Sequence, residues 1–277
     1  MKVALIQLNG SDSPQENSQS VCAFFDEAVR HGADFILTPE VTNCVSTSRS
    51  HQESVLRDEC KDIVLAALRA KTRDAGVWCL IGSLALKTRD PDGRFANRSF
   101  LINPQGGISA WYDKINMFDV TVSETEIYRE SSGYRPGTRA VLADMGAAKI
   151  GLTICYDLRF PSLYRTLAQE GAQILTVPSA FSPVTGAAHW ETLLRARAIE
   201  TGAFILAPAQ TGTHAATAGK PRETYGHSMV VGPWGEVLVD AGTQPGVTSV
   251  DIDVSDVENA RRRIPSLRQE IQFEGPR

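Results

Sequence analysis

The sequence predicts an α/β protein built as a four-layer αββα sandwich with an internal pseudo-two-fold repeat. Short β-rich runs alternate with helical periodicity along the chain, which is the pattern of α/β folds. Residues 32–39 resemble residues 171–178, and residues 2–6 resemble residues 149–154. Two such halves bury most surface when their sheets stack face to face and helices cover the outside.

The first half contains predicted strands, two predicted helices and a tight turn. The strands span residues 3–6, 35–37, 77–86, 99–102 and 108–112, and the helices span residues 14–30 and 56–70. In the second helix, apolar residues recur at steps of 4, 3, 4 and 3, which places them on one face. The turn at residues 103–106 is similar to residues 232–235, so three matches occur in the same order.

We expect one domain rather than two. The similar halves extend roughly over residues 1–114 and 147–253, and no low-complexity linker separates them. The predicted domain covers residues 1–277, with a core up to about residue 267 and a polar tail over residues 265–277. A hydrophobic fraction of 42% is ordinary for such a globular domain.

Two irregular stretches interrupt the pattern. Residues 116–139 show little periodicity, and loops this long inside compact domains are usually functional or disordered. Residues 211–223 are rich in Gly, Ala and Thr, which is typical of a mobile surface loop. We therefore expect the first stretch to contribute to function and the second to be mobile.

Composition and charge exclude several classes of protein. The formal net charge of −4 and the pI near 5.8 argue against nucleic-acid binding through bulk positive charge. No stretch approaches the roughly 20 apolar residues that span a bilayer, and the N-terminal run is predicted to be a strand rather than a signal peptide. We expect a cytoplasmic protein that binds neither nucleic acid nor membranes.

The five cysteines form neither a disulfide framework nor a zinc motif. Their number is odd and they are unclustered, so the thiols are expected to be reduced. The histidines are dispersed and no nucleotide-binding motif occurs, so we expect no metal and no cofactor. Four cysteines are interpreted as packing residues: Cys22, Cys44, Cys60 and Cys79.

Three reactive side chains follow predicted strands. Glu40, Lys114 and Cys155 each lie just after a strand, and ligand sites of α/β proteins gather beyond the carboxyl ends of strands. In acyl transfer by a thiol, a carboxylate accepts the thiol proton and an ammonium group stabilises the oxyanion. Pro161 suits the first turn of a helix, so Cys155 is expected near a helix N-terminus, where a thiolate is stabilised.

Two other interpretations stay open at this point. His189 or His227 could pair with Cys155 in a Cys-His-Asp triad, with Asp157 or Asp240 as the orienting residue. The positions flanking the cysteine lack the small residues of a nucleophile elbow, which disfavours an α/β-hydrolase triad. A binding or scaffold protein without catalysis is the second alternative, and the complete set of three reactive residues argues against it.

These residues lie in three motifs: Thr38-Pro39-Glu40, Tyr112-Asp113-Lys114 and Cys155-Tyr156-Asp157-Leu158-Arg159-Phe160-Pro161. In their order and spacing they resemble the nitrilase superfamily of carbon–nitrogen hydrolases, from Val3 to about Leu267. The resemblance implies the αββα nitrilase fold, a small-molecule amide substrate and no cofactor. It also implies that Cys155 is the nucleophile, Glu40 the general base and Lys114 an oxyanion stabiliser, with the backbone N–H of Tyr156 as second oxyanion donor.

The second active-site carboxylate is a choice between two residues. Members of the superfamily use another glutamate in the loop after the lysine, commonly followed by Ser and then Pro-Gly. Glu130 matches best, because Ser131 follows it and Pro136-Gly137 lies downstream. The first part of the loop lacks the usual Pro-Gly, so Glu126 stays the alternative.

Residues 225–235 and 188–198 resemble the Nit branch of the superfamily. Its members act on deaminated glutathione or 2-oxoglutaramate, which implies an amidase that releases ammonia from a terminal carboxamide through a thioester. Deaminated glutathione is the first expectation; 2-oxoglutaramate and an N-carbamoyl amino acid are the alternatives. Because these substrates carry carboxylates, Arg159 is expected to bind the substrate, with a structural ion pair as the alternative role. Phe181, just past the repeated strand at residues 171–178, is expected to line the pocket. The resemblance also implies homodimers or larger assemblies.

Overall fold

The computed structural model describes residues 1–122, 127–269 and 274–275 and contains two six-stranded mixed sheets. The first sheet has the order β16 (Gly246–Asp251), β1 (Lys2–Gln7), β2 (Phe35–Leu37), β3 (Trp78–Leu86), β4 (Ala96–Ile102) and β5 (Ile108–Asp113). The second has the order β8 (Val141–Asp144), β9 (Lys149–Leu152), β10 (Ile174–Thr176), β11 (Phe204–Ala207), β14 (Met229–Val231) and β15 (Val237–Asp240).

The two sheets repeat one topology. Strands β1, β2 and β3 run parallel, and so do β9, β10 and β11. On one side of each trio, two further strands continue the sheet, each antiparallel to the strand before it: β4 and β5 in the first sheet, and β14 and β15 in the second. On the other side lies one antiparallel strand, β16 or β8. The predicted internal repeat is therefore confirmed.

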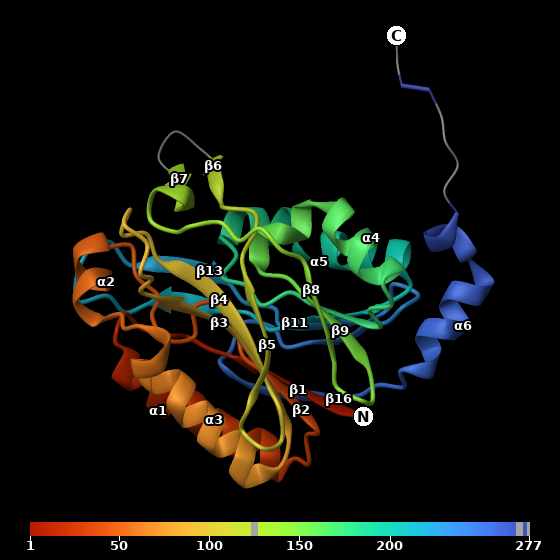
Figure 1. Cartoon of the computed structure of the whole chain (residues 1–277), viewed down its shortest axis with the longest axis horizontal. Helices are drawn as coiled ribbons and strands as arrows, with labels where there is room; N and C mark the ends of the chain where they lie inside the picture. Colours follow the sequence, from red (N-terminus) through yellow and green to blue (C-terminus); the bar gives the residue numbers. More distant parts are fainter. Residues whose placement is uncertain (123–126, 270–273, 276–277) are drawn as a thin grey trace.

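Helices cover the outer face of each sheet and complete the predicted four layers (Figure 1). Helices α1 (Pro14–Arg30) and α3 (Ile63–Ala75) cover the first sheet, and α4 (Pro161–Gln169) and α5 (Pro183–Thr201) cover the second. The chain returns to the first sheet through β16 and then forms α6 (Ser255–Arg263). In the part of the chain that the structure describes, no helix is long and apolar enough to cross a membrane.

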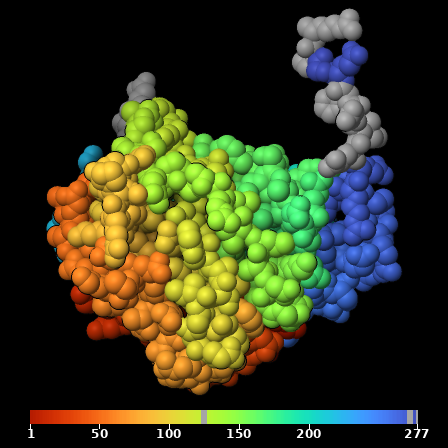
Figure 2. Space-filling view, in the orientation of Figure 1, coloured from red at the N-terminus to blue at the C-terminus, as the bar shows by residue number. Residues whose placement is uncertain are grey.

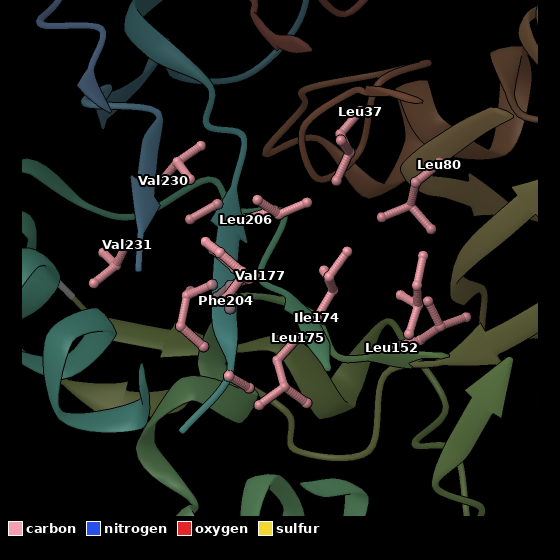
Figure 3. Close-up of a cluster of buried hydrophobic side chains, with 14 of the residues drawn as sticks. Leu37, Leu80, Leu152, Ile174, Leu175, Val177, Phe204, Leu206, Val230 and Val231 are labelled. Atoms are coloured by element: carbon pink, nitrogen blue, oxygen red, sulfur yellow. The ribbon is translucent and has the colours of Figure 1, made fainter. Parts of the chain in front are cut away.

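The strands of the first sheet divide their apolar side chains between two cores, because successive residues of a strand point to opposite faces. Leu5 packs in the core between the sheets, whereas Ile6 packs in the core under α1 and α3. Figure 3 shows Leu37 and Leu80 of the first sheet in the same cluster as Leu206 of the second. The two halves form one continuous body (Figure 2). Because they share this core, we propose that residues 1–277 form a single domain.

The predicted helix over residues 56–70 is wrong in its first part. Helix α2 (Arg49–Val55) ends just before Leu56, and α3 begins only at Ile63. The side chain of Asp62 accepts the N–H of Leu65 and caps α3 at that point. Cys60 lies in a 3₁₀ turn between the two helices and is exposed, so its interpretation as a packing residue is also wrong.

The stretch predicted as a mobile loop is largely a β-hairpin. Strand β12 (Thr211–His214) pairs with β13 (Arg222–Tyr225), and His214 is buried with both ring nitrogens at hydrogen-bond distance from acceptors or donors. The connecting turn is held as well, because the Asp12 carboxylate accepts the N–H of Thr217 at 2.7 Å. The stretch is therefore paired at both ends, with an irregular connection over residues 215–221, and its mobility stays a prediction.

The long irregular stretch after Lys114 contains short elements rather than a helix. Strand β6 (Asp119–Thr121) pairs with β7 (Ile127–Arg129), and the 3₁₀ turn Glu130–Ser132 follows. Glu126, the alternative second carboxylate, lies outside the described residues. The turn that begins at Glu130 folds back toward Lys114, and this contact is the start of the candidate site.

Candidate active site

The two halves of the repeat contribute one residue each, Glu40 from the first half and Cys155 from the second. Each residue follows a core strand by three positions, Glu40 after β2 and Cys155 after β9. Gly82 of β3 lies against the segment that connects β2 to Glu40. A Cβ added at Gly82 would come within 2.0 Å of the Thr38 carbonyl oxygen. Only glycine permits this approach of two backbones, so Gly82 fixes the path of the chain that leads to Glu40.

Cys155 has a backbone conformation that is rare for a side-chain-bearing residue. Its φ angle is 48°, in the left-handed region, and its N–H donates to the Pro178 carbonyl at 3.0 Å. Such a conformation costs about 1–3 kcal/mol and is found mostly at functional sites, where the surrounding structure holds it. The strain therefore points to Cys155 independently of its chemistry.

The Glu40 carboxylate is buried and fully hydrogen bonded. Its Oε1 accepts from Lys114 Nζ at 3.0 Å and from Asn97 Nδ2 at 2.9 Å, and its Oε2 accepts from the Ala180 N–H at 2.9 Å. Burial alone would raise the pKa of this carboxyl, but the positive charges of Lys114 and Arg222 outweigh it and lower the pKa. Glu40 is therefore ionised at neutral pH.

Lys114 is a buried ammonium between two carboxylates. Its Nζ lies 3.0 Å from Glu40 Oε1 and 2.8 Å from Glu130 Oε2, and its side chain is 2% exposed. Burial would lower its pKa, but the charges of Glu130 and Glu40 raise the pKa well above that of an ordinary lysine. Lys114 therefore stays charged over the whole physiological range.

The Cys155 thiol lies in reach of these charges but is not a stable thiolate. Burial raises its pKa, and the Glu40 carboxylate, which also makes a side-chain hydrogen bond with it, raises the pKa further. Helix α4 begins at Pro161 as expected, but Cys155 begins a separate 3₁₀ helix (Cys155–Arg159). The expected stabilisation of a thiolate by a helix N-terminus is therefore wrong; the thiol needs a base, and Glu40 is beside it.

These groups converge on one cavity of about 440 Å³, a volume within the range of ligand pockets. Its lining includes Glu40, Lys114, Glu130, Cys155 and Tyr156. Among the hydrogen bonds of the described residues, the backbone N–H of Tyr156 has no acceptor. The cavity thus combines a thiol, two carboxylates, an ammonium group and an unused backbone donor.

Two polar residues of the cavity had not been expected from the sequence. Asn97 of β4 is buried and donates from Nδ2 to both carboxylates, at 2.9 Å to Glu40 and 3.3 Å to Glu130. Its backbone carbonyl also accepts the Lys114 N–H at 3.0 Å. Arg222 of β13 is the second, and its charge acts on Glu40.

The two expected substrate-binding residues have different positions. Phe181 lines the cavity. Arg159 does not: its guanidinium carbon lies 5.5 Å from the centroid of the Phe181 ring, and its Nη2 lies 3.3 Å from His189 Nδ1. The structure therefore does not support direct binding of the substrate by Arg159 in this conformation.

A Cys-His-Asp triad is not assembled among residues 1–122 and 127–269. His189 and His227 line a different pocket, and His227 pairs with Asp240 at 3.0 Å. Asp157 is buried and accepts from the Tyr112 hydroxyl at 2.7 Å and from the Ile154 N–H at 2.9 Å. Asp157 therefore joins β5 to the turn of Cys155 and orients no histidine.

A two-sheet α/β sandwich with a cysteine, two carboxylates and a buried lysine in one cavity defines a class of thiol enzymes that hydrolyse carbon–nitrogen bonds. The sequence matches the carbon-nitrogen hydrolase family over residues 2–262. The chain belongs to this family, and it is an enzyme of the amidase type.

The comparison with individual proteins agrees with this assignment. A relative from Yersinia enterocolitica named deaminated glutathione amidase is 36% identical over 274 residues, 96% of this chain and 91% of the relative. The crystal structure of the Caenorhabditis elegans NitFhit protein matches with a TM-score of 0.89 and 32% identity, over 97% of this chain and 64% of that one. This chain therefore spans less than two thirds of the NitFhit protein.

A third match concerns chemistry at a cysteine. The structure of a mutant amidase from Nesterenkonia sp. AN1, which shows the product of Michael addition of acrylamide at its active-site cysteine, has a TM-score of 0.77. It is 26% identical, over 96% of this chain and 98% of that one. The predicted family and fold are confirmed.

Proposed function

We propose that the protein is a cysteine-dependent amidase in which Glu40, Lys114, Glu130 and Cys155 are the catalytic residues. The observation that carries this proposal is the position of Lys114, whose Nζ contacts both Glu40 and Glu130 in the cavity that holds the Cys155 thiol. Because the thiol is protonated and Glu40 is ionised, the carboxylate is the group that accepts the thiol proton.

The first half of the reaction forms a thioester. Glu40 takes the thiol proton as the Cys155 sulfur attacks the amide carbonyl carbon. Lys114 Nζ and the Tyr156 N–H stabilise the oxyanion, and a donor of this kind is worth about 2.7–4 kcal/mol. Glu40 then gives its proton to the leaving nitrogen, the carbon–nitrogen bond breaks, and the amine departs.

The second half of the reaction hydrolyses the thioester. A water molecule attacks the thioester carbonyl while Glu40 accepts its proton, and the same oxyanion donors act again. The carbon–sulfur bond breaks, Glu40 returns the proton to the Cys155 sulfur, and the carboxylic acid leaves. Glu130 acts through Lys114, because both of its oxygens lie within 3.0 Å of the ammonium group and fix its direction.

We further propose deaminated glutathione as the substrate. The support is the name of the relatives, which are 34–38% identical to this chain over nearly its whole length. Glutathione contains only secondary amides, so its deaminated form has no primary carboxamide. The release of ammonia expected from the sequence therefore applies to 2-oxoglutaramate, whereas deaminated glutathione cleaved at the amide that precedes cysteine releases cysteinylglycine. Both substrates share the same 2-oxoglutaryl acyl half.

A substrate panel tests this choice. We expect kcat/KM for deaminated glutathione to exceed that for 2-oxoglutaramate and for an N-carbamoyl amino acid by at least about tenfold, a difference of 1.4 kcal/mol in transition-state binding. Cysteinylglycine is measured as the product of the first substrate and ammonia as the product of the second. A preference for the carbamoyl substrate would overturn the assignment. The Cys155→Ala variant measures the background rate of product release for all three substrates.

The pH dependence of kcat/KM is expected to show an acid limb below the ordinary glutamate range. Protonation of Glu40 removes the acceptor for the thiol proton, and its pKa is lowered from the ordinary value of about 4.3. The profile should be flat between about pH 6 and 8 and fall only below about pH 4. Circular dichroism at each pH checks that the chain is folded. An acid limb centred near neutral pH would contradict Glu40 as the base.

A further inference from the structure

Arg222 lies at the inner wall of the catalytic cavity, although it comes from the hairpin that the sequence indicated as a mobile loop. It is the first residue of β13, half-buried, and lines the cavity with Cys155. Its Nη2 donates to the Ala180 carbonyl at 2.7 Å, and the N–H of the same Ala180 donates to Glu40. One residue of backbone thus separates the guanidinium from the general base.

Arg222 has no carboxylate partner among the described residues. Of the other cations that line the cavity, Lys114 contacts two carboxylates and Arg49 Nε lies 3.0 Å from Glu53 Oε1, whereas Arg129 is exposed. The bond to Ala180 occupies one of the five N–H donors of a guanidinium. A half-buried arginine that lines a cavity and has no carboxylate partner among the described residues is suited to bind a carboxylate in a two-point contact.

The anion that fits this place is part of the substrate. In the proposed substrates, three carbons separate the reacting carbonyl carbon from the acyl carboxylate. The carbonyl must lie between Cys155 and Lys114, and Arg222 is close enough to this centre for its charge to act on Glu40. Glu130 is already paired with Lys114, at 2.8 Å from its Nζ.

We propose that Arg222 binds the carboxylate of the substrate's acyl half and selects dicarboxylic acid monoamides over neutral amides. This inference rests on the proposed function and adds the residue that determines acyl specificity. It replaces Arg159, which does not line the cavity. It also explains why a cation is left without an acidic partner at this place.

The test uses two substrates with the same leaving group, glutarylcysteinylglycine and pentanoylcysteinylglycine, which differ by the acyl carboxylate. At about pH 8, where Glu40 is ionised in every variant, Arg222→Met should lower kcat/KM for the glutaryl substrate by about 10- to 100-fold, the effect of losing a charged hydrogen-bonded pair. The pentanoyl substrate should change less than about threefold, and Arg222→Lys should restore part of the loss. Arg49→Met, at another cavity arginine, should leave the ratio of the two substrates unchanged.

Binding of 2-oxoglutarate gives a readout that does not depend on turnover. By calorimetry, Cys155→Ala should bind this dicarboxylate, and the added Arg222→Met change should raise the Kd at least about tenfold. If the wild type hydrolyses neither peptide, the proposed function fails, and this measurement still decides the role of Arg222. An equal loss for both substrates, or binding of 2-oxoglutarate that is absent or independent of Arg222, would overturn the inference.

Discussion

Cys155→Ala is expected to lower kcat/KM for deaminated glutathione by at least about 10⁴-fold, the effect of removing a catalytic nucleophile. Within the described residues, the cavity offers no histidine to replace the lost thiol in covalent catalysis, and the remaining oxyanion donors support only slow direct attack by water. Stability should change by no more than about 1 kcal/mol, because a single small side chain is shortened. Steady-state kinetics and thermal unfolding measure the two effects.

Cys60→Ala is the matched control for this experiment. It makes the same substitution at an exposed cysteine between α2 and α3, outside the cavity. Its kcat/KM and unfolding temperature should equal those of the wild type. Turnover of Cys155→Ala within tenfold of the wild type would refute the assignment of Cys155 as nucleophile.

Lys114→Met is expected to lower both activity and stability. The substitution leaves Glu40 and Glu130 buried or partly buried without the cation that lies within 3.0 Å of each, which costs about 3–5 kcal/mol at neutral pH. It also removes an oxyanion donor and raises the pKa of the base, so kcat/KM should fall by at least about 10³-fold. Denaturant unfolding and steady-state kinetics measure these losses.

The pH dependence of stability distinguishes this explanation from a simple loss of packing. In the wild type the Glu40 pKa is lowered, so its contribution to the free energy of unfolding is present at neutral pH and is lost as the pH falls. In Lys114→Met the Glu40 carboxyl loses the cation that offsets its burial, so its pKa should rise and the variant should regain stability between about pH 7 and 5. Lys149→Met, at an exposed lysine of β9, should follow the wild type. A pH-independent loss in Lys114→Met would contradict the account.

Much of the site could be predicted because reactive residues follow strands of both halves, and ligand sites of α/β proteins gather beyond the carboxyl ends of strands. Glu40 and Cys155 each follow a parallel core strand by three residues, and Lys114 follows β5 directly. Glu130 could be chosen from its sequence context, and its contacts with Lys114 support the choice. The αββα layers followed from the alternation of apolar runs and helical periodicity, and the topology repeats as expected.

The missed features depend on pairing that local patterns do not encode. Asn97 pairs with Ala85 of β3, beyond a register shift between Ile81 and Leu84, and contacts Glu40; no spacing in the sequence reveals this pairing. Arg222 lies in a stretch rich in Gly, Ala and Thr, and only the alternation of Thr211 and Thr213 in β12 could have indicated a strand there. The raised thiol pKa arises from burial beside Glu40, a tertiary effect.

The central claim is that Cys155 forms a covalent bond to the acyl half of the substrate. The p-nitrophenyl ester of glutaric acid tests it directly, because its good leaving group makes acylation fast and lets the acyl-enzyme accumulate. We predict a burst of about one p-nitrophenolate per active site and a glutaryl group on the peptide that contains Cys155. A burst that persists in Cys155→Ala, or a glutaryl group found only on another residue, would contradict the account.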